Sequence, residues 1–170
     1  MSVKAYLAHK MTGRTGVELV VESAIAQAAC VRYGVTALDP VVFEGVEASG
    51  QVVSGGDPKV LKKLWKRDKQ MIREAHVLVD LTGNLKSEGV LHEIGYARYY
   101  LWKPVVRVIK GYSGPTISDF EDDGIVGSFS EAAELVQRRW GTWPKRVIWR
   151  AKFIPKALVK WAFYQLQGWR

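Results

Sequence analysis

Short apolar runs alternate with longer amphipathic segments along the first 140 residues of the chain. The apolar runs have the length of buried strands and lie at 4–8, 35–38, 76–80 and 103–109. The segments between them repeat apolar residues at helical spacing, which predicts helices over 17–33, from 58 to about 75, from about 89 to 101 and over 128–139. Such alternation predicts an α/β domain with a parallel sheet and helices on both faces. We assign this domain to residues 1–140.

Two stretches show no persistent period. Residues 41–57 hold four glycines, and so long a loop in a compact domain is typical of a lid or of part of a substrate pocket. Residues 111–127 are polar and rich in turn-forming residues. We expect their acidic run, 121–123, to be a solvated turn, because its spacing fits no EF-hand or zinc pattern.

Two carboxylates fall at positions where solubility does not require them. Asp68 lies inside an apolar helical stripe whose opposite face is rich in lysine and arginine. Glu93 lies in the first turns of the next predicted helix, one turn from Val90 and Ala97. Asp68 could simply pair with a neighbouring lysine, and Glu93 could simply favour the helix dipole. Because the two acids flank one loop at the edge where α/β sheets place ligands, we interpret them as a nucleophile and a general acid or base.

The loop after the first strand, His9 to Gly16, contains glycines and precedes a helix, so its backbone N–H groups can face a phosphate. It matches neither a Walker motif nor a dinucleotide fingerprint. His9 could contact a base or a phosphate, or be an ordinary polar loop residue. Met11 and Trp65 could stack on a base, or belong to the core.

Composition narrows the class of protein. A chain of 170 residues with 48% hydrophobic content fits one domain, and a single cysteine, Cys30, excludes a disulfide framework. We expect a buried structural thiol and a cytoplasmic protein, since no apolar run is long enough for a signal peptide or a membrane span. No metal set is apparent, and we expect no cofactor.

The positive charge is concentrated in one place. The formal net charge is +8, and residues 141–170 contribute +7 of it, since they hold seven lysines and arginines and no acid. The same segment, a basic extension with a predicted short helix, contains four tryptophans: Trp143, Trp149, Trp161 and Trp169. A basic, tryptophan-rich helical tail suits an anionic membrane surface or single-stranded nucleic acid. We favour the alternative that its apolar face packs on the domain or on a second subunit.

Several motifs together resemble the nucleoside 2-deoxyribosyltransferase family, which includes the 2′-deoxynucleoside 5′-monophosphate N-glycosidases. The resemblance covers roughly residues 3–139 and is most specific at the Glu-Ile-Gly-Tyr-Ala element with its preceding glycine. The matching residues are Tyr6-Leu-Ala, Met11-Thr-Gly13, Asp68-x-x-x-Ile72, Ser87-x-Gly89-x-x-x-Glu93-Ile-Gly-Tyr-Ala97 and Lys103-Pro104-Val105.

The resemblance implies a Rossmann-like, flavodoxin-like domain with a five-stranded parallel sheet and an N-glycosidic chemistry. Glu93 would be the nucleophile that attacks the anomeric carbon and forms a covalent glycosyl-enzyme. Asp68 would assist proton transfer to the leaving base, and Tyr6 would hydrogen-bond Glu93 and orient it. The family also implies a homodimer or higher homo-oligomer whose neighbouring subunits help to close the site.

Substrate choice within the resemblance depends on Ser87. In the monophosphate hydrolases a serine at this place binds phosphate, whereas the transferases of free nucleosides often have an acid there. The hydrolases also carry an arginine where this chain has Thr12, and Arg14 could substitute for it. We therefore favour hydrolysis of (2′-deoxy)nucleoside 5′-monophosphates over base exchange on free deoxynucleosides, and over a non-catalytic nucleotide-binding module docked by its tail. The expected substrate-binding residues are His9, Met11, Thr12, Gly13, Arg14, Ser87 and Gly89.

Overall fold

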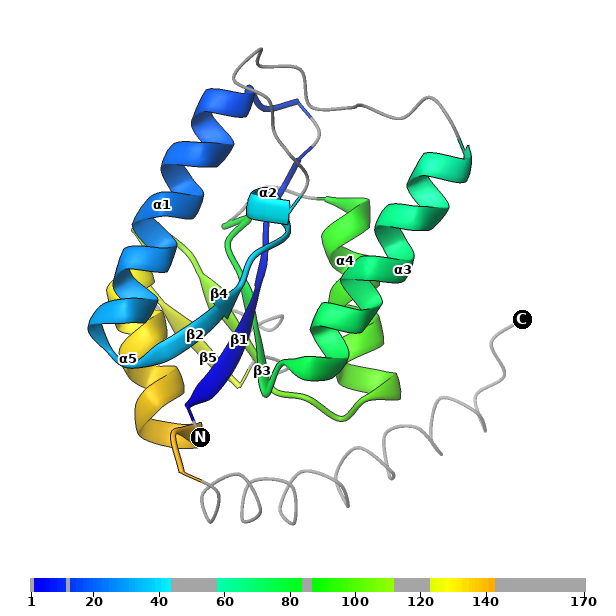
Figure 1. Ribbon diagram of the computed structural model, residues 1–170. Coiled ribbons are helices and arrows are strands. Elements are labelled where there is room, and N and C mark those ends of the chain that lie inside the picture. Colours follow the sequence, from blue (N-terminus) through cyan, green and yellow to red (C-terminus); the bar gives the residue numbers. More distant parts are fainter. Residues whose placement is uncertain (1, 12, 44–57, 84–86, 112–122, 143–170) are drawn as a thin grey trace.

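A five-stranded parallel sheet forms the centre of the computed structural model, with the strand order β2-β1-β3-β4-β5 (Figure 1). The structure describes all residues except 1, 12, 44–57, 84–86, 112–122 and 143–170. The strands are β1 (Val3–Ala8), β2 (Val35–Leu38), β3 (Val77–Asp80), β4 (Val105–Val108) and β5 (Gly124–Val126). The predicted α/β fold, with its five-stranded parallel sheet, is therefore confirmed. Of the predicted lid or pocket at 41–57 and the basic extension at 141–170, residues 44–57 and 143–170 lie outside the described residues.

Helices cover both faces of the sheet (Figure 1). The first layer contains α1 (Gly16–Arg32) and α5 (Phe129–Trp140), and the opposite layer contains α3 (Pro58–Glu74) and α4 (Glu88–Gly95). A single-turn helix, α2 (Pro40–Phe43), follows β2. No helix among the described residues is both long enough and apolar enough to cross a bilayer.

Strand β1 contributes side chains to the hydrophobic cores on both faces of the sheet. Ala5 and Leu7 pack with α1 and α5, whereas Tyr6 and Ala8 pack with α3 and α4, because successive side chains of a strand point to opposite faces. The strand order reverses direction between β1 and β3, and such a switch point is where doubly wound sheets open a ligand crevice. Tyr6 therefore points into the layer of α3 and α4, beside this switch point.

Local signals set the helix ends. Thr15 caps α1 through a capping box with Glu18, and Gly34 takes a φ of +68° just after the helix, a conformation that glycine adopts at little cost. The Ser128 side chain caps α5 by accepting from the Glu131 N–H at 3.2 Å. The predicted helix ranges 17–33, 58 to about 75 and 128–139 agree with α1, α3 and α5 to within one residue at each end.

The segment 111–127 differs from its prediction as a loop. Its last residues form β5, which pairs with β4, so the sheet has a strand that the apolar pattern does not reveal. Asp123 is not a solvated turn residue, because its Oδ2 accepts from the Val105 N–H at 2.8 Å and lies 3.4 Å from Nη2 of Arg98. Burial raises the pKa of Asp123, although the Val105 N–H and Arg98 act in the opposite direction.

The helix predicted from 89 to 101 is not uniform. The α-helix α4 ends at Gly95, and a π-helical turn, Tyr96–Tyr100, follows it. The Leu101 N–H donates to the Tyr96 carbonyl at 3.3 Å, and the Tyr96 ring packs edge-on against Trp65, with the ring centroids 5.9 Å apart. Trp65 is therefore a partly buried residue that packs against the core between the sheet and the layer of α3 and α4.

Candidate active site

A tyrosine and a glutamate from distant parts of the chain meet in the layer of α3 and α4. Tyr6 is fully buried on β1, and its hydroxyl donates to Oε1 of Glu93 at 3.0 Å. Glu93 is half-buried in α4. The hydrogen bond fixes one carboxylate oxygen of Glu93, so its orientation is set by the sheet and not by its own helix alone.

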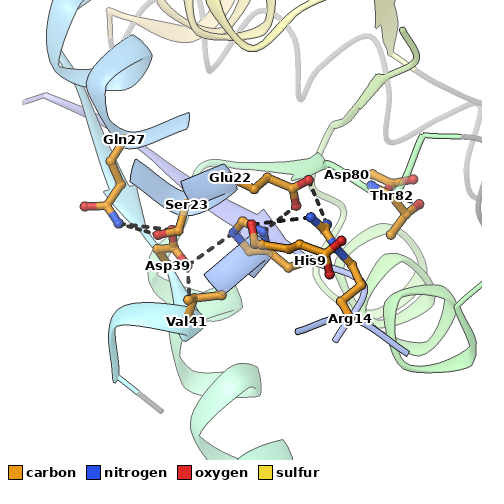
Figure 2. Close-up of polar contacts among 10 residues, drawn as sticks. His9, Arg14, Glu22, Ser23, Gln27, Asp39, Val41, Asp80 and Thr82 are labelled. Carbon is orange, nitrogen blue, oxygen red and sulfur yellow. Dashed lines mark hydrogen bonds and ion pairs between the residues drawn. The ribbon is translucent and has the colours of Figure 1, made fainter. Parts of the chain in front are cut away.

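The loop after β3 positions the start of α4. Asp80 ends β3, where its Oδ1 accepts from the N–H of Thr82 at 2.9 Å and from the Thr82 hydroxyl at 2.7 Å, and Figure 2 shows these two side chains together. Arg107 lies 3.3 Å from the other carboxylate oxygen of Asp80. At the far end of the loop, Ser87 caps α4 by accepting from the Val90 N–H at 3.5 Å.

Asp68 is buried on the inner side of α3. Its neighbours one turn away, Trp65 and Ile72, pack into the same core as Tyr6. Burial raises the pKa of Asp68 to about 6, although Arg67, whose Nη2 lies 3.7 Å from Oδ1, acts in the opposite direction. A carboxyl group with this pKa is partly protonated near neutral pH, so it can donate a proton as well as accept one.

A second polar cluster lies at the carboxyl end of β1, on the side of α1 (Figure 2). His9 is buried, with Nδ1 3.0 Å from Oε1 of Glu22 and Nε2 3.2 Å from Oδ1 of Asp39. Glu22 also pairs with Arg14, whose Nη1 donates to Oε2 at 2.7 Å. We refer to His9, Arg14, Glu22 and Asp39 as the histidine cluster.

The charges of the histidine cluster stabilise one another. Burial alone would lower the pKa of His9, but its contacts with Asp39 and Glu22 outweigh burial and raise this pKa to about 9. For the acids Glu22 and Asp39, burial alone would raise the pKa, but their contacts with His9 and their other partners outweigh burial and lower both pKa values. His9 is therefore a cation held between two anions.

Asp39 extends the histidine cluster to the start of α2. Its Oδ2 accepts from the Ser23 hydroxyl at 2.7 Å and from Nε2 of Gln27 at 3.1 Å, and its Oδ1 accepts from the Val41 N–H at 2.9 Å (Figure 2). The histidine cluster thus joins the loop after β1, helix α1 and the end of β2. These contacts hold the loop after β1 in place against α1 and the end of β2.

The predicted site residues do not all lie together. Tyr6 and Glu93 are in direct contact, and Asp68 is buried in the same layer. His9 is buried between Glu22 and Asp39, a position that favours the alternative in which it does not contact the substrate, and Arg14 is paired with Glu22. The remaining members are Ser87 at the helix cap, Gly89 exposed on α4, Met11 half-buried, Gly13 exposed with a φ of +77°, and Thr12, which lies outside the described residues.

Sequence reasoning missed Glu22 and Asp39. Glu22 lies between Leu19 and Ala26 on the buried side of α1, which is the same signal that revealed Asp68. Asp39 carries a weaker signal, since an aspartate before a proline also marks an ordinary strand end. Within the described ranges, no three His, Cys, Asp or Glu side chains are grouped so that they could hold a metal ion.

Comparisons with known proteins identify the fold. No protein-family model matches the chain, and no curated protein matches its sequence. A 2-deoxyribosyltransferase from Bacillus psychrosaccharolyticus is similar in structure, with a TM-score of 0.58, 20% identity, and coverage of 77% of this chain and 90% of the other. A conserved protein from Enterococcus faecalis V583 gives a TM-score of 0.55, 15% identity, and coverage of 82% and 99%.

A further structure is similar more distantly. The CMP N-glycosidase of Clostridium botulinum gives a TM-score of 0.45 and 16% identity, with coverage of 79% of this chain and 98% of the other. This score is too low to bear on the fold. The two higher scores identify the protein as a Rossmann-like α/β domain with the fold of a 2-deoxyribosyltransferase.

Proposed function

We propose that the protein is an enzyme that cleaves the N-glycosidic bond of (2′-deoxy)nucleoside 5′-monophosphates, with Glu93 as nucleophile. The observation that supports this most is the 3.0 Å hydrogen bond from the buried Tyr6 hydroxyl to Oε1 of Glu93. A fully buried tyrosine holds one oxygen of a half-buried carboxylate and so fixes the orientation of that carboxylate. This is the arrangement that a positioned nucleophile requires.

The chemistry needs two carboxyl groups in different protonation states. Breaking the bond between sugar and base develops positive charge on the anomeric carbon, which an ionised Glu93 stabilises and then captures as a covalent glycosyl-enzyme. The departing base must receive a proton. Asp68, whose pKa burial raises to about 6, is suited to donate that proton near neutral pH and then to activate the water that releases the sugar.

Ser87 and the N-terminus of α4 support a monophosphate substrate. The Ser87 oxygen accepts from the Val90 N–H, which leaves the serine hydroxyl hydrogen to donate to a phosphate oxygen. The exposed Gly89 follows in the first turn of α4, where the helix dipole favours an anion. This support comes from α4 alone among the described residues, since Arg14 already pairs with Glu22.

The pairing of Arg14 favours a second candidate, base exchange on free deoxynucleosides. A guanidinium that is neutralised by Glu22 at 2.7 Å attracts a 5′-phosphate weakly. A free nucleoside needs no cation at that place. The structural neighbour from Bacillus psychrosaccharolyticus is itself a 2-deoxyribosyltransferase. Transfer and hydrolysis share the covalent intermediate and differ only in whether a base or water releases it.

The test is a substrate survey with matched variants. The protein is incubated with the four deoxynucleoside monophosphates and the four free deoxynucleosides, with and without a second free base, and base release is followed by chromatography. Glu93→Gln should abolish release. Glu134→Gln is the matched control, because Glu134 is exposed on α5, in the layer on the opposite face of the sheet, and should leave the rate within about twofold.

Each outcome supports or refutes one of the candidate functions. Release from a monophosphate without added base supports the hydrolase, and release from free nucleosides only in the presence of a second base supports the transferase. Turnover that survives Glu93→Gln would refute the proposed nucleophile. No turnover on any substrate would refute the enzyme and favour a nucleotide-binding module.

A further inference from the structure

The outward face of α3 is strongly basic. The helix holds seven lysines and arginines against two acids. Five of the cations recur at the spacing of one helix face and are exposed: Lys59, Lys62, Lys63, Lys66 and Arg73. This face is turned away from the sheet, because the apolar side of α3 packs against it (Figure 1). We refer to these five residues as the basic face of α3.

The two acids of α3 leave this face positive. Asp68 is buried on the inner side of the helix. Glu74 lies at the last position, where it accepts from Nε2 of Gln70 at 3.3 Å and lies 4.0 Å from Nζ of Lys4. Exposed charges that serve only solubility are usually mixed in sign, whereas charges of one sign along one face repel one another and attract an anionic partner.

Exposed aromatic rings lie beside the end of the basic face. Tyr100 is 76% exposed and Tyr99 is 46% exposed, both in the π-helical turn after α4. The centroid of the Tyr100 ring is 5.9 Å from that of Tyr96, and the guanidinium carbon of Arg73 is 5.8 Å from the same Tyr96 centroid. Tyr96 therefore connects the basic face to an open aromatic ring.

We propose that this surface binds single-stranded nucleic acid, with the basic face along the phosphates and the Tyr100 ring stacked on a base. Cations that follow the backbone and aromatic rings that stack on bases are the two elements of sequence-tolerant single-strand binding. The basic face lies on the other side of α3 from Asp68. The proposal therefore does not rest on the proposed function.

The length of the basic face fits a run of phosphates. The distance along the helix axis from Lys59 to Arg73 is about 21 Å, at 1.5 Å per residue. The phosphates of a stacked strand repeat about every 3.4 Å, so the basic face spans about six of them. Its five cations can therefore neutralise most of the charge of the strand that lies along it.

The make-up of this surface distinguishes a nucleic acid from two other anionic partners. A helix that binds in a membrane surface buries an apolar face among the lipids, but the apolar side of α3 already packs in the core. An interface with an acidic protein has an apolar centre, whereas the exposed residue between Lys66 and Arg73 is the polar Gln70. An open ring also favours unpaired bases, because the bases of a duplex stack on one another.

The test measures binding of the full-length protein to a fluorescent oligothymidylate of about 15 nucleotides, by anisotropy between about 50 and 200 mM salt. The triple variant Lys62→Gln/Lys63→Gln/Lys66→Gln should bind at least roughly tenfold more weakly at the lowest salt. The slope of log affinity against log salt should fall by about 2, since each neutralised phosphate of a single strand contributes about 0.7. Thermal unfolding should show that this variant folds like the wild type, because all three side chains are exposed.

A charge-matched control removes three lysines from the basic extension. Lys152→Gln/Lys156→Gln/Lys160→Gln should keep the affinity within about threefold of the wild type. A loss of affinity in this variant, with binding kept in the α3 variant, would assign the binding to the extension and overturn the proposal. A wild type that binds no oligonucleotide at about 50 mM salt also overturns it, as does one that binds only vesicles of anionic lipid.

A pair of variants tests stacking at constant charge. Tyr100→Ala removes the ring and should weaken binding at least about fivefold, whereas Tyr100→Phe keeps the ring and should bind like the wild type. A duplex of the same length should bind more weakly than the single strand. An affinity that both variants leave unchanged, or that both reduce equally, refutes the stacking contact, and tighter binding of the duplex refutes the single-stranded ligand.

Discussion

Replacing Asp68 by asparagine removes a buried charge from α3 without changing the size of the side chain. Burial raises the pKa of Asp68 from its ordinary 3.8 to about 6. At roughly 1.4 kcal/mol per pKa unit, ionising this carboxyl group in the folded protein costs up to about 3 kcal/mol. The side chain keeps 13% of its surface in water, and screening lowers the figure to about 2 kcal/mol. Asp68→Asn should therefore stabilise the fold at neutral pH by about 2 kcal/mol.

The sign of the pH dependence follows from the direction of the shift. A carboxyl group whose pKa is higher in the folded state contributes its full stability below the unfolded pKa, 3.8, and loses it as the pH rises through about 6. The wild type should lose stability relative to Asp68→Asn over this interval. Above it, the difference between the two proteins should be constant.

Urea denaturation of both proteins at pH 4.5, 6 and 7.5 measures this difference directly. Glu74→Gln is the control, since Glu74 is exposed on the same helix and should change stability by less than about 0.5 kcal/mol. The same Asp68→Asn protein should lose activity by roughly 10²-fold to 10⁴-fold if Asp68 transfers the proton to the leaving base. A variant that is less stable than the wild type at pH 7.5, or a difference that does not vary with pH, would refute the reasoning.

Three further substitutions test contacts at the site and below it. Tyr6→Phe removes a hydrogen bond to a carboxylate and should lower kcat by roughly 10-fold to 100-fold, with a smaller change in KM, in steady-state assays. In the wild type, the free energy of unfolding should fall by about 2 kcal/mol as the pH rises from 6.5 through about 9, because a histidine with a raised pKa stabilises the folded state only while it is protonated. His9→Gln should not show this fall, and urea midpoints of both proteins at pH 6.5 and 9.5 measure it. Lys103→Met should cost about 1 to 3 kcal/mol in the same assay, because Nζ donates to the carbonyls of Arg73 and Ala75 at the end of α3; an unchanged midpoint would contradict it.

The sheet was predictable wherever its strands are buried on both faces. The runs that became β1, β3 and β4 are apolar because helices cover both sides of them, and each of the three strands contributes side chains to the cores on both faces of the sheet. Strand β5 was not predictable, because it is a three-residue edge strand, Gly124–Val126, that is only half-buried. An edge strand this short has too few residues to show a period. Its place is set by pairing with β4, which is a long-range contact.

The candidate site was predictable only in part, for a related reason. A carboxylate inside an apolar helical stripe is visible in the sequence, and this signal applies to Asp68 and Glu93. The contact between Tyr6 and Glu93 came from the family resemblance, since no local pattern joins two residues 87 positions apart. The partners of His9 were missed because burial depends on the packing of α1 against β1 and β2. A histidine in a glycine-bearing loop carries no sign of that packing.

The buried acids differ in how their charges are compensated, and this difference distinguishes the acids that stabilise the fold from the one suited to proton transfer. Glu22 and Asp39 have lowered pKa values because His9 lies between them, so their ionised forms stabilise the fold. Asp123 has a raised pKa but is held by the Val105 N–H and Arg98, which connect it to β4 and to the π-helical turn Tyr96–Tyr100. Asp68 also has a raised pKa, and Arg67, whose Nη2 lies 3.7 Å from Oδ1, offsets the effect of burial only in part. A fold gains nothing by keeping a carboxyl group under those conditions, and a proton transfer at neutral pH requires one. Asp68 is therefore the residue at which stability and the proposed function make opposite predictions.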